Sequence, residues 1–152
     1  MSSIEMIPPF KSVLLPINPE QVQPPAIEFA ARVADQYDIA LSLLFVFELP
    51  GHNKGAGFAV VSESQREEDV NRIVAEAVTP LVGGVTIAEV IIRNGKAADM
   101  IIEVADELNI DVIVMGAHGT TGLTHFIMGS VTEKVVHLAT RPVLTIPLRK
   151  AL

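Results

Sequence analysis

The chain has 152 residues, and its 11 Lys and Arg against 18 Asp and Glu give a formal net charge of −7. About 150 residues is the usual size of one domain, here residues 1–152, and a composition of 49% hydrophobic and 19% charged residues excludes a disordered chain. The lack of cysteine excludes disulfides, thiolate zinc sites and cysteine nucleophiles, and the negative charge argues against nucleic acid and anionic membranes as partners, because both need a positive field.

The N-terminal region has neither the charged start nor the apolar stretch of a signal peptide. Pro8 and Pro9 predict that residues 1–10 form an extended arm before the first strand. The longest apolar runs, such as 112–115, are far shorter than the roughly 20 residues of a membrane-spanning helix. These features predict a cytoplasmic protein.

Short apolar runs alternate along the chain with segments whose apolar residues recur at helical spacing. The runs are rich in Leu, Val and Ile and predict buried strands, the first of which ends at Pro16. Gly83 and Gly84 end the longest helical segment. In chain order the predicted elements are strand 13–15, a helix from residue 24, strand 39–47, a loop over 49–60, helix 62–82, strand 85–92, helix 97–108, strand 111–115, a loop over 116–129, helix 131–139 and strand 142–146.

This order of elements predicts a doubly wound α/β fold. Strands that are apolar on both faces and joined by helices form a parallel sheet with helices on both sides. Ligands of such sheets bind beyond the C-terminal ends of the strands, where the strand order reverses. The residues that follow each strand are therefore the first candidates for a site, and above all the segment 116–130.

The segment between the fourth strand and the last helix has the pattern Gly-x2-Gly-x9-Gly-Ser, formed by Gly116, Gly119, Gly129 and Ser130. Glycine allows the backbone to approach a ligand closely. The N-terminus of the following helix favours an anion, and the Ser130 hydroxyl can cap that helix or donate to a phosphate oxygen. The pattern predicts a phosphate site made of uncharged donors. The competing interpretation is a tight turn followed by a capped helix.

These residues also carry a resemblance to a known family. Residues 93–148, and more loosely 11–148, resemble the universal stress protein family. The matching stretches are 98–102, 111–119, 129–135 and 141–147. The resemblance implies a Rossmann-like, five-stranded parallel sheet of order 3-2-1-4-5 and, because the glycine pattern is complete, the ATP-binding subgroup.

The resemblance further implies that the ligand is ATP, ADP or AMP, with Mg²⁺ bound through the phosphates. The residues implied to hold the phosphates and ribose are Gly116, Gly119, Gly129, Ser130 and the Val131 amide. The residues implied to line the adenosine are Pro16, Ile17 and Asn18, which follow the first strand, and Val46, whose backbone would meet the adenine edge.

The sequence departs from the family pattern at two positions. Asn18 stands where the family commonly has Asp, and it keeps an acceptor oxygen but lacks the charge and one acceptor. Phe45 stands where the family often has His, just before Val46. We predict that Phe45 belongs to the core.

Several polar residues outside the pattern are further candidates. His118 and His125 flank the glycines and either touch a phosphate or belong to a solvated loop. Arg93, which follows the predicted third strand, is a candidate for a contact on the ligand side. Lys134 either neutralises a distal phosphate or stays solvated, and Asp99 is expected to interact with its own helix dipole.

Neither a metal site within the protein nor an efficient catalytic site is predicted. His52 and His137 have no third ligand at metal-binding spacing. The Walker pattern is absent, and no Lys, Arg, Asp or Glu lies between Gly116 and Ser130, whereas phosphoryl transfer needs a positioned base and cationic charge. We therefore expect nucleotide binding with little or no hydrolysis.

The predicted function is that of an adenine-nucleotide-binding stress-response protein, acting as a dimeric sensor or switch. Exposed strand edges pair readily with other chains, and the family resemblance implies a homodimer paired through the fifth strand at Val143, Leu144, Thr145 and Ile146. Two alternatives remain: a dimeric interaction protein of the same fold that binds no nucleotide, and a weak ATPase. A flavodoxin-like FMN carrier is a fourth possibility, but aromatic residues that would stack a flavin are missing.

Overall fold

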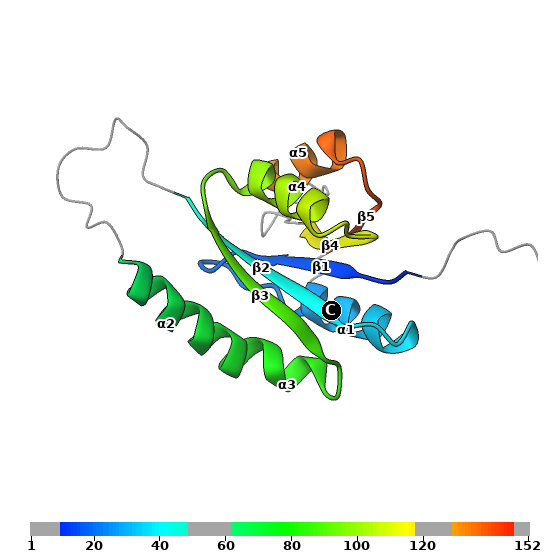
Figure 1. The fold of residues 1–152 in the computed structure, drawn as a ribbon, viewed down its shortest axis with the longest axis horizontal. Coiled ribbons are helices and arrows are strands. Elements are labelled where there is room, and N and C mark those ends of the chain that lie inside the picture. Colours follow the sequence, from blue (N-terminus) through cyan, green and yellow to red (C-terminus); the bar gives the residue numbers. More distant parts are fainter. Residues whose placement is uncertain (1–9, 49–61, 118–128, 148–152) are drawn as a thin grey trace, which may run out of the picture.

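The computed structural model of the protein describes residues 10–48, 62–117 and 129–147 (Figure 1). The predicted arm, apart from Phe10, and the predicted loop over 49–60 lie outside these residues. The elements in chain order are β1 (Val13–Ile17), α1 (Pro24–Gln36), β2 (Leu41–Phe47), α2 (Glu63–Ile73), the π-helical turn η1 (Val74–Val78), α3 (Thr79–Val82), β3 (Ile87–Asn94), α4 (Ala97–Glu107), β4 (Val112–Ala117), α5 (Ser130–Leu138) and β5 (Val143–Pro147).

The strands form one parallel sheet in the order β3-β2-β1-β4-β5. The helices α1, α2 and α3 cover one face, and α4 and α5 cover the other (Figure 1). The predicted doubly wound fold and its strand order are therefore confirmed. The chain leaves β1 toward one face and β4 toward the other, so the order reverses between these two neighbouring strands.

Two aliphatic cores lie on either side of the sheet. Successive side chains of a strand point to opposite faces, so Val13 and Leu15 pack with α1 whereas Leu14 packs with α4 and α5. Phe45 is fully buried in the core on the α1 side, which confirms that it is a core residue. A strand that is apolar on both faces is therefore the signature of a central position in this sheet.

The prediction that Pro16 ends the first strand is wrong, because β1 continues to Ile17 and Pro16 pairs with Leu44 of β2. Proline lacks the N–H that a central strand needs. The pairing between β1 and β4, however, covers only Val13 and Leu14. Beyond Leu14 the two strands separate, so the absent N–H of Pro16 removes no bond to β4.

The predicted single helix over 62–82 is interrupted by η1. Ser62 caps its start by accepting a hydrogen bond from Gln65 N at 3.2 Å. Further along, the N–H of Thr79 bonds to the Val74 carbonyl, five residues earlier. Pro80 accounts for this wider turn, because proline supplies no N–H and its ring clashes with the carbonyl four residues before it in a regular α-helix.

Small shifts at three predicted boundaries change where candidate residues lie. The third strand begins at Ile87 and continues to Asn94, so Arg93 belongs to the strand rather than following it, and it pairs with Val46. The fourth strand continues to Ala117, which places Gly116 at its end. Pairing with the neighbouring strand extends both elements beyond their apolar runs.

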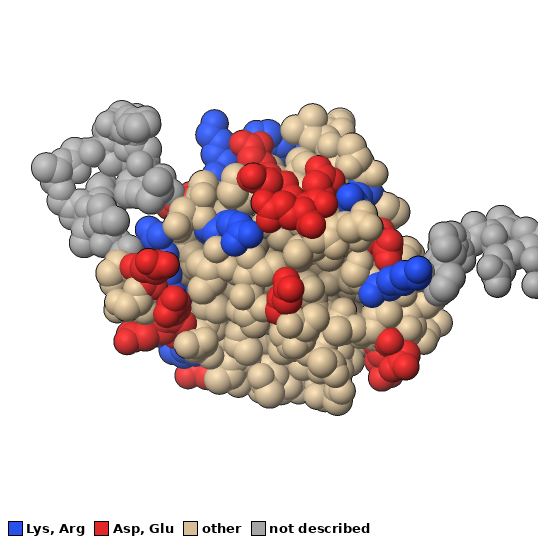
Figure 2. Space-filling view, in the orientation of Figure 1, with Lys and Arg blue, Asp and Glu red and all other residues tan. Residues whose placement is uncertain are grey.

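The charged side chains are unevenly distributed over the described surface. Acidic residues gather over α4, whereas few charged side chains lie over the sheet edge at β3 (Figure 2). A ligand that carries negative charge therefore needs local donors, because the overall field of the protein repels it. No helix of the described residues is long and apolar enough to cross a membrane.

Candidate functional site

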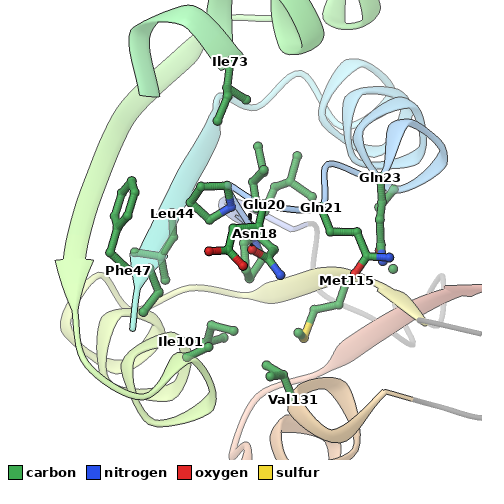
Figure 3. Close-up of a pocket in the computed structure, with 18 of the residues that line it drawn as sticks. Asn18, Glu20, Gln21, Gln23, Leu44, Phe47, Ile73, Ile101, Met115 and Val131 are labelled. Atoms are coloured by element: carbon green, nitrogen blue, oxygen red, sulfur yellow. Dashed lines mark hydrogen bonds between the residues drawn. The ribbon is translucent and has the colours of Figure 1, made fainter. Parts of the chain in front are cut away.

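A pocket of about 670 Å³ opens at the C-terminal ends of β1, β2 and β4. Its walls come from the segment between β1 and α1, the end of β2, α2, the start of α4, the end of β4 and the start of α5. Asn18 lies near the middle, between Phe47 on one side and Met115 and Val131 on the other (Figure 3). We call this cavity the switch-point pocket, because it lies where the strand order reverses.

The pairing of β1 with β4 ends at Leu14, and the pocket opens beyond this point, between the chain segments that follow the two strands. The chain after β1 crosses to α1 on one face, and the chain after β4 leads to α5 on the other. Diverging connections cannot fill the space between them, which is the general reason that ligands bind at a switch point.

Most of the residues that the sequence analysis selects line the switch-point pocket. They are Pro16, Ile17, Asn18, Val46, Gly116, Gly129, Ser130 and Val131. Arg93 does not line it; its guanidinium instead pairs with Glu107 on α4, at 3.1 Å. His118, Gly119, His125 and His52 lie outside the described residues.

The first turn of α5 faces the pocket with its backbone donors. Gly129 is the N-cap residue in an extended conformation, and no side chain caps this helix within the part of the chain that the structure describes. The first N–H groups of a helix have no acceptor inside the helix, and the helix dipole adds positive potential there. The hydroxyl of Thr132 donates to the Gly116 carbonyl at 3.1 Å and so holds this turn against the end of β4.

The other helix N-termini at this pocket have N–H groups that are missing or already engaged. Helix α1 begins with Pro24 and Pro25, which have no N–H groups. At the start of α4, the N–H of Ala97 already donates to the carboxylate of Glu48 at 3.0 Å. At α5, by contrast, the helix start contributes Gly129, Ser130, Val131 and Thr132 to the described pocket lining.

Gly116 makes room for a neighbouring side chain. A Cβ atom at position 116 would lie 1.6 Å from Oε1 and 2.7 Å from Cδ of Gln23. Gln23, at the N-cap of α1, thus packs its carboxamide against the end of β4 across the switch point (Figure 3). The missing Cβ at position 116 leaves the space that the Gln23 carboxamide occupies, whereas the predicted close approach of a ligand to Gly116 stays a prediction.

Asn18 already uses part of its hydrogen-bonding capacity. Its Oδ1 accepts a bond from the N–H of Glu20 at 2.9 Å, and its carbonyl accepts one from the N–H of Gln21 at 3.0 Å. These bonds form a turn that projects the exposed Asn18 side chain into the pocket. One lone pair of Oδ1 and the amide N–H groups remain to meet a ligand.

The charged side of the pocket that α2 contributes was not predicted from the sequence. Arg66, Asp69 and Arg72 recur every third residue, so they lie on one face of the helix, and all three line the pocket. Asp69 accepts from Arg72 at 3.2 Å and from Gln65 at 3.1 Å. The spacing shows that the three share a face, but only the tertiary structure shows that this face borders the pocket. The predicted phosphate site of uncharged donors therefore concerns only the α5 side of the pocket, and the α2 side carries charged side chains.

Lys134 is engaged outside the pocket lining. Its ammonium pairs with Asp99 in the first turn of α4, at 3.2 Å, and both side chains are about half exposed. Within residues 10–48, 62–117 and 129–147, no three His, Asp or Glu side chains come close enough together to hold a metal ion.

A parallel sheet of order 3-2-1-4-5, with a pocket at the point where the strand order reverses, defines a doubly wound α/β protein. The model of the universal stress protein family matches residues 9–147, and the chain belongs to this family. A universal stress protein of Synechocystis is 33% identical over 142 residues, which cover 91% of this chain and 86% of that protein.

Solved structures of the same fold include proteins with bound nucleotides. A universal stress protein in complex with cAMP superposes with a TM-score of 0.66 at 18% identity, covering 92% of this chain and 98% of that chain. The universal stress protein of Archaeoglobus fulgidus in complex with dAMP superposes with a TM-score of 0.61 at 22% identity, covering 91% of this chain and 98% of that chain. At these identities the likeness concerns the fold.

Proposed function

We propose that this universal stress protein binds an adenine nucleotide in the switch-point pocket and acts as a nucleotide-dependent sensor or switch. The observation that carries the proposal is the first turn of α5, which no side chain of the described residues caps and which lies beside Gly116 at a cavity of about 670 Å³. Backbone N–H groups at a helix start bind phosphate without a basic side chain, which suits an acidic protein. The cAMP and dAMP complexes of two relatives support this choice of ligand.

The order of the strands suggests how the nucleotide lies. Its phosphates bind at Gly129, Ser130 and Val131, next to β4, and its ribose lies over Asn18 at the end of β1. Its base reaches Val46 at the end of β2. Neighbouring strands are about 4.8 Å apart, so β2 and β4 are separated by about 10 Å, which leaves room for a ribose between base and phosphate.

The pocket supports binding better than turnover. Two of its carboxylates are engaged, since Glu48 accepts from the start of α4 and Asp69 pairs with Arg72. Phosphoryl transfer needs a group that positions the attacking water together with cationic charge on the transition state. Mg²⁺, when it accompanies the nucleotide, is held by the phosphates in this proposal and serves to neutralise their charge.

Calorimetry with ATP, ADP and AMP tests the proposal, supported by two variants of the first helical residue. Ser130→Ala removes only the hydroxyl, whereas Ser130→Pro also removes a backbone N–H at a position where proline suits a helix. Gly129, with ψ of 153°, already has the extended conformation that precedes proline. We expect the proline variant to bind ATP distinctly more weakly than the alanine variant.

The absence of heat and of competition at millimolar nucleotide would refute nucleotide binding. Equal affinities of the Ser130→Ala and Ser130→Pro variants would show instead that the main chain of α5 does not hold the phosphates. Multiple-turnover phosphate release above background, lost in both variants, would favour the weak ATPase over a binding protein.

We also propose that the protein is a cytoplasmic homodimer paired through β5. Within the described residues this strand has β4 as its sheet neighbour on one side only. Val143, Leu144, Thr145 and Ile146 are only half-buried along it. An unpaired edge with such side chains favours pairing with a second copy of the chain.

A further inference from the structure

Arg66 is the best-anchored cation of the pocket wall. Its Nη1 donates to Oδ1 of Asn94 at the end of β3. Its guanidinium carbon lies 5.7 Å from the centre of the Phe47 ring, within the range of a cation–π contact. Two neighbouring strands therefore hold one side chain of α2 in place at the border of the pocket.

One N–H group of this guanidinium has no acceptor among the described residues. Nε of Arg66 is buried and has no hydrogen-bond partner among the residues that the structure describes. Asp69, three residues further along this helix face, pairs with Arg72. Buried donors in native proteins nearly always have a partner, and leaving one unsatisfied is costly. Since Arg66 lines the switch-point pocket, a molecule bound there can supply the missing acceptor once this side chain turns toward it.

We propose that Arg66 recognises the base of the nucleotide, donating its Nε–H to an acceptor of the heterocyclic ring. This inference rests on the proposed nucleotide site and adds a recognition residue that the glycine pattern does not contain. Arginine carries donors only, so it suits the ring nitrogens of a base rather than its amino groups.

The position of Arg66 favours the base over the phosphates. Arg66 contacts β2 and β3, whereas the free donors of α5 lie next to β4, beyond β1. Two to three strand spacings of about 4.8 Å separate these places. A nucleotide whose phosphates lie at α5 therefore brings its base toward Arg66.

The test compares ligands that have the base with one that lacks it. Affinities of ATP, AMP, adenosine and inorganic tripolyphosphate are measured by calorimetry or by competition, for the wild type and for Arg66→Gln, Arg66→Lys and Arg32→Gln. Arg32→Gln removes the same charge as Arg66→Gln. Because Arg32 is an exposed residue of α1 that does not line the pocket, this variant is the matched control. Thermal melting of each variant shows whether it is folded.

We expect Arg66→Gln to weaken ATP, AMP and adenosine by a common factor of at least about tenfold, the typical loss of a hydrogen bond to a charged group. Tripolyphosphate should be unaffected, and Arg32→Gln should bind all ligands like the wild type. Arg66→Lys should not restore adenosine binding, because lysine keeps the charge but not the planar, directed donors.

Three results would overturn the inference. A loss for ATP and tripolyphosphate with none for adenosine would place Arg66 at the phosphates. Full recovery with lysine would show a general effect of charge. Wild-type affinity of a folded Arg66→Gln variant would show that Arg66 contacts no ligand, while nucleotide binding itself would stand. If the wild type binds neither ATP nor adenosine, the nucleotide proposal fails first, and the role of Arg66 fails with it.

Discussion

Gly116→Ala places a methyl group where the carboxamide of Gln23 now lies. The new Cβ would be 1.6 Å from Gln23 Oε1 and 2.7 Å from its Cδ, so the Gln23 side chain must turn away. The clash involves the far end of a flexible side chain, and the backbone of Gly116 has no left-handed conformation that alanine would strain. The cost is therefore that of moving one side chain from its preferred rotamer, roughly 0.5–1.5 kcal/mol.

An effect of the substitution on the unfolded chain offsets part of this cost. Alanine restricts the unfolded chain more than glycine does, which stabilises the folded state by about 0.4–1 kcal/mol at a compatible position. Gly116→Ala should therefore change the free energy of unfolding by less than about 1 kcal/mol in either direction. In the Gln23→Ala background the clash is gone, and the same change at position 116 should be stabilising. The expected coupling energy between the two positions is roughly 0.5–1.5 kcal/mol.

A double-mutant cycle with urea unfolding measures this coupling, with nucleotide affinity as the second readout. If phosphates approach Gly116 as proposed, the methyl group weakens ATP binding in both backgrounds, because removing Gln23 does not remove the methyl group. Stability is then recovered in the double variant while affinity is not. A coupling energy of zero would refute the steric argument, and unchanged ATP affinity would refute the proposed contact between Gly116 and the nucleotide.

Three further predictions concern the ribose contact, the core and the sheet edge. Asn18→Asp should strengthen adenosine binding about fivefold, because a charged acceptor gains roughly 1 kcal/mol over a neutral one; calorimetry that shows equal or weaker binding would contradict the ribose assignment. Phe45→Ala should lower the free energy of unfolding by about 3–5 kcal/mol, as expected for a fully buried ring, and a loss below about 1 kcal/mol in urea unfolding would speak against its core position. Thr145→Lys should convert the proposed dimer to a monomer in sedimentation, because it brings like charges to a shared edge; a persisting dimer would exclude the β5 interface.

The fold could be predicted from local patterns because the residue types and their spacing within each segment indicate whether it forms a strand or a helix. Strands such as β2 and β4 are apolar on both faces, which requires a central position with helices on either side. The boundaries were less accurate where pairing overrides the local signal. Arg93 lies within β3 because the strand continues alongside β2, and Pro16 lies within β1 because β4 has already separated from it.

Only part of the pocket could be predicted from the sequence. The residues after β1 and before α5 were found because a strand end and a glycine–serine pair mark them. Gln23 and Arg66 were not found, since nothing in their own segments distinguishes them from ordinary polar residues. Their importance depends on what they touch, namely Gly116 in one case and Phe47 and Asn94 in the other.

The amino-acid sequence by itself thus determined the alternation of strands and helices, the apolar core and the glycine pattern, because these depend on residue types at short spacing. The tertiary structure alone decided which side chains meet at the switch point. Gln23, Arg66 and Gly116 come from three separate crossover units, and they become neighbours of one cavity only when parallel strands bring their C-terminal ends to the same edge of the sheet.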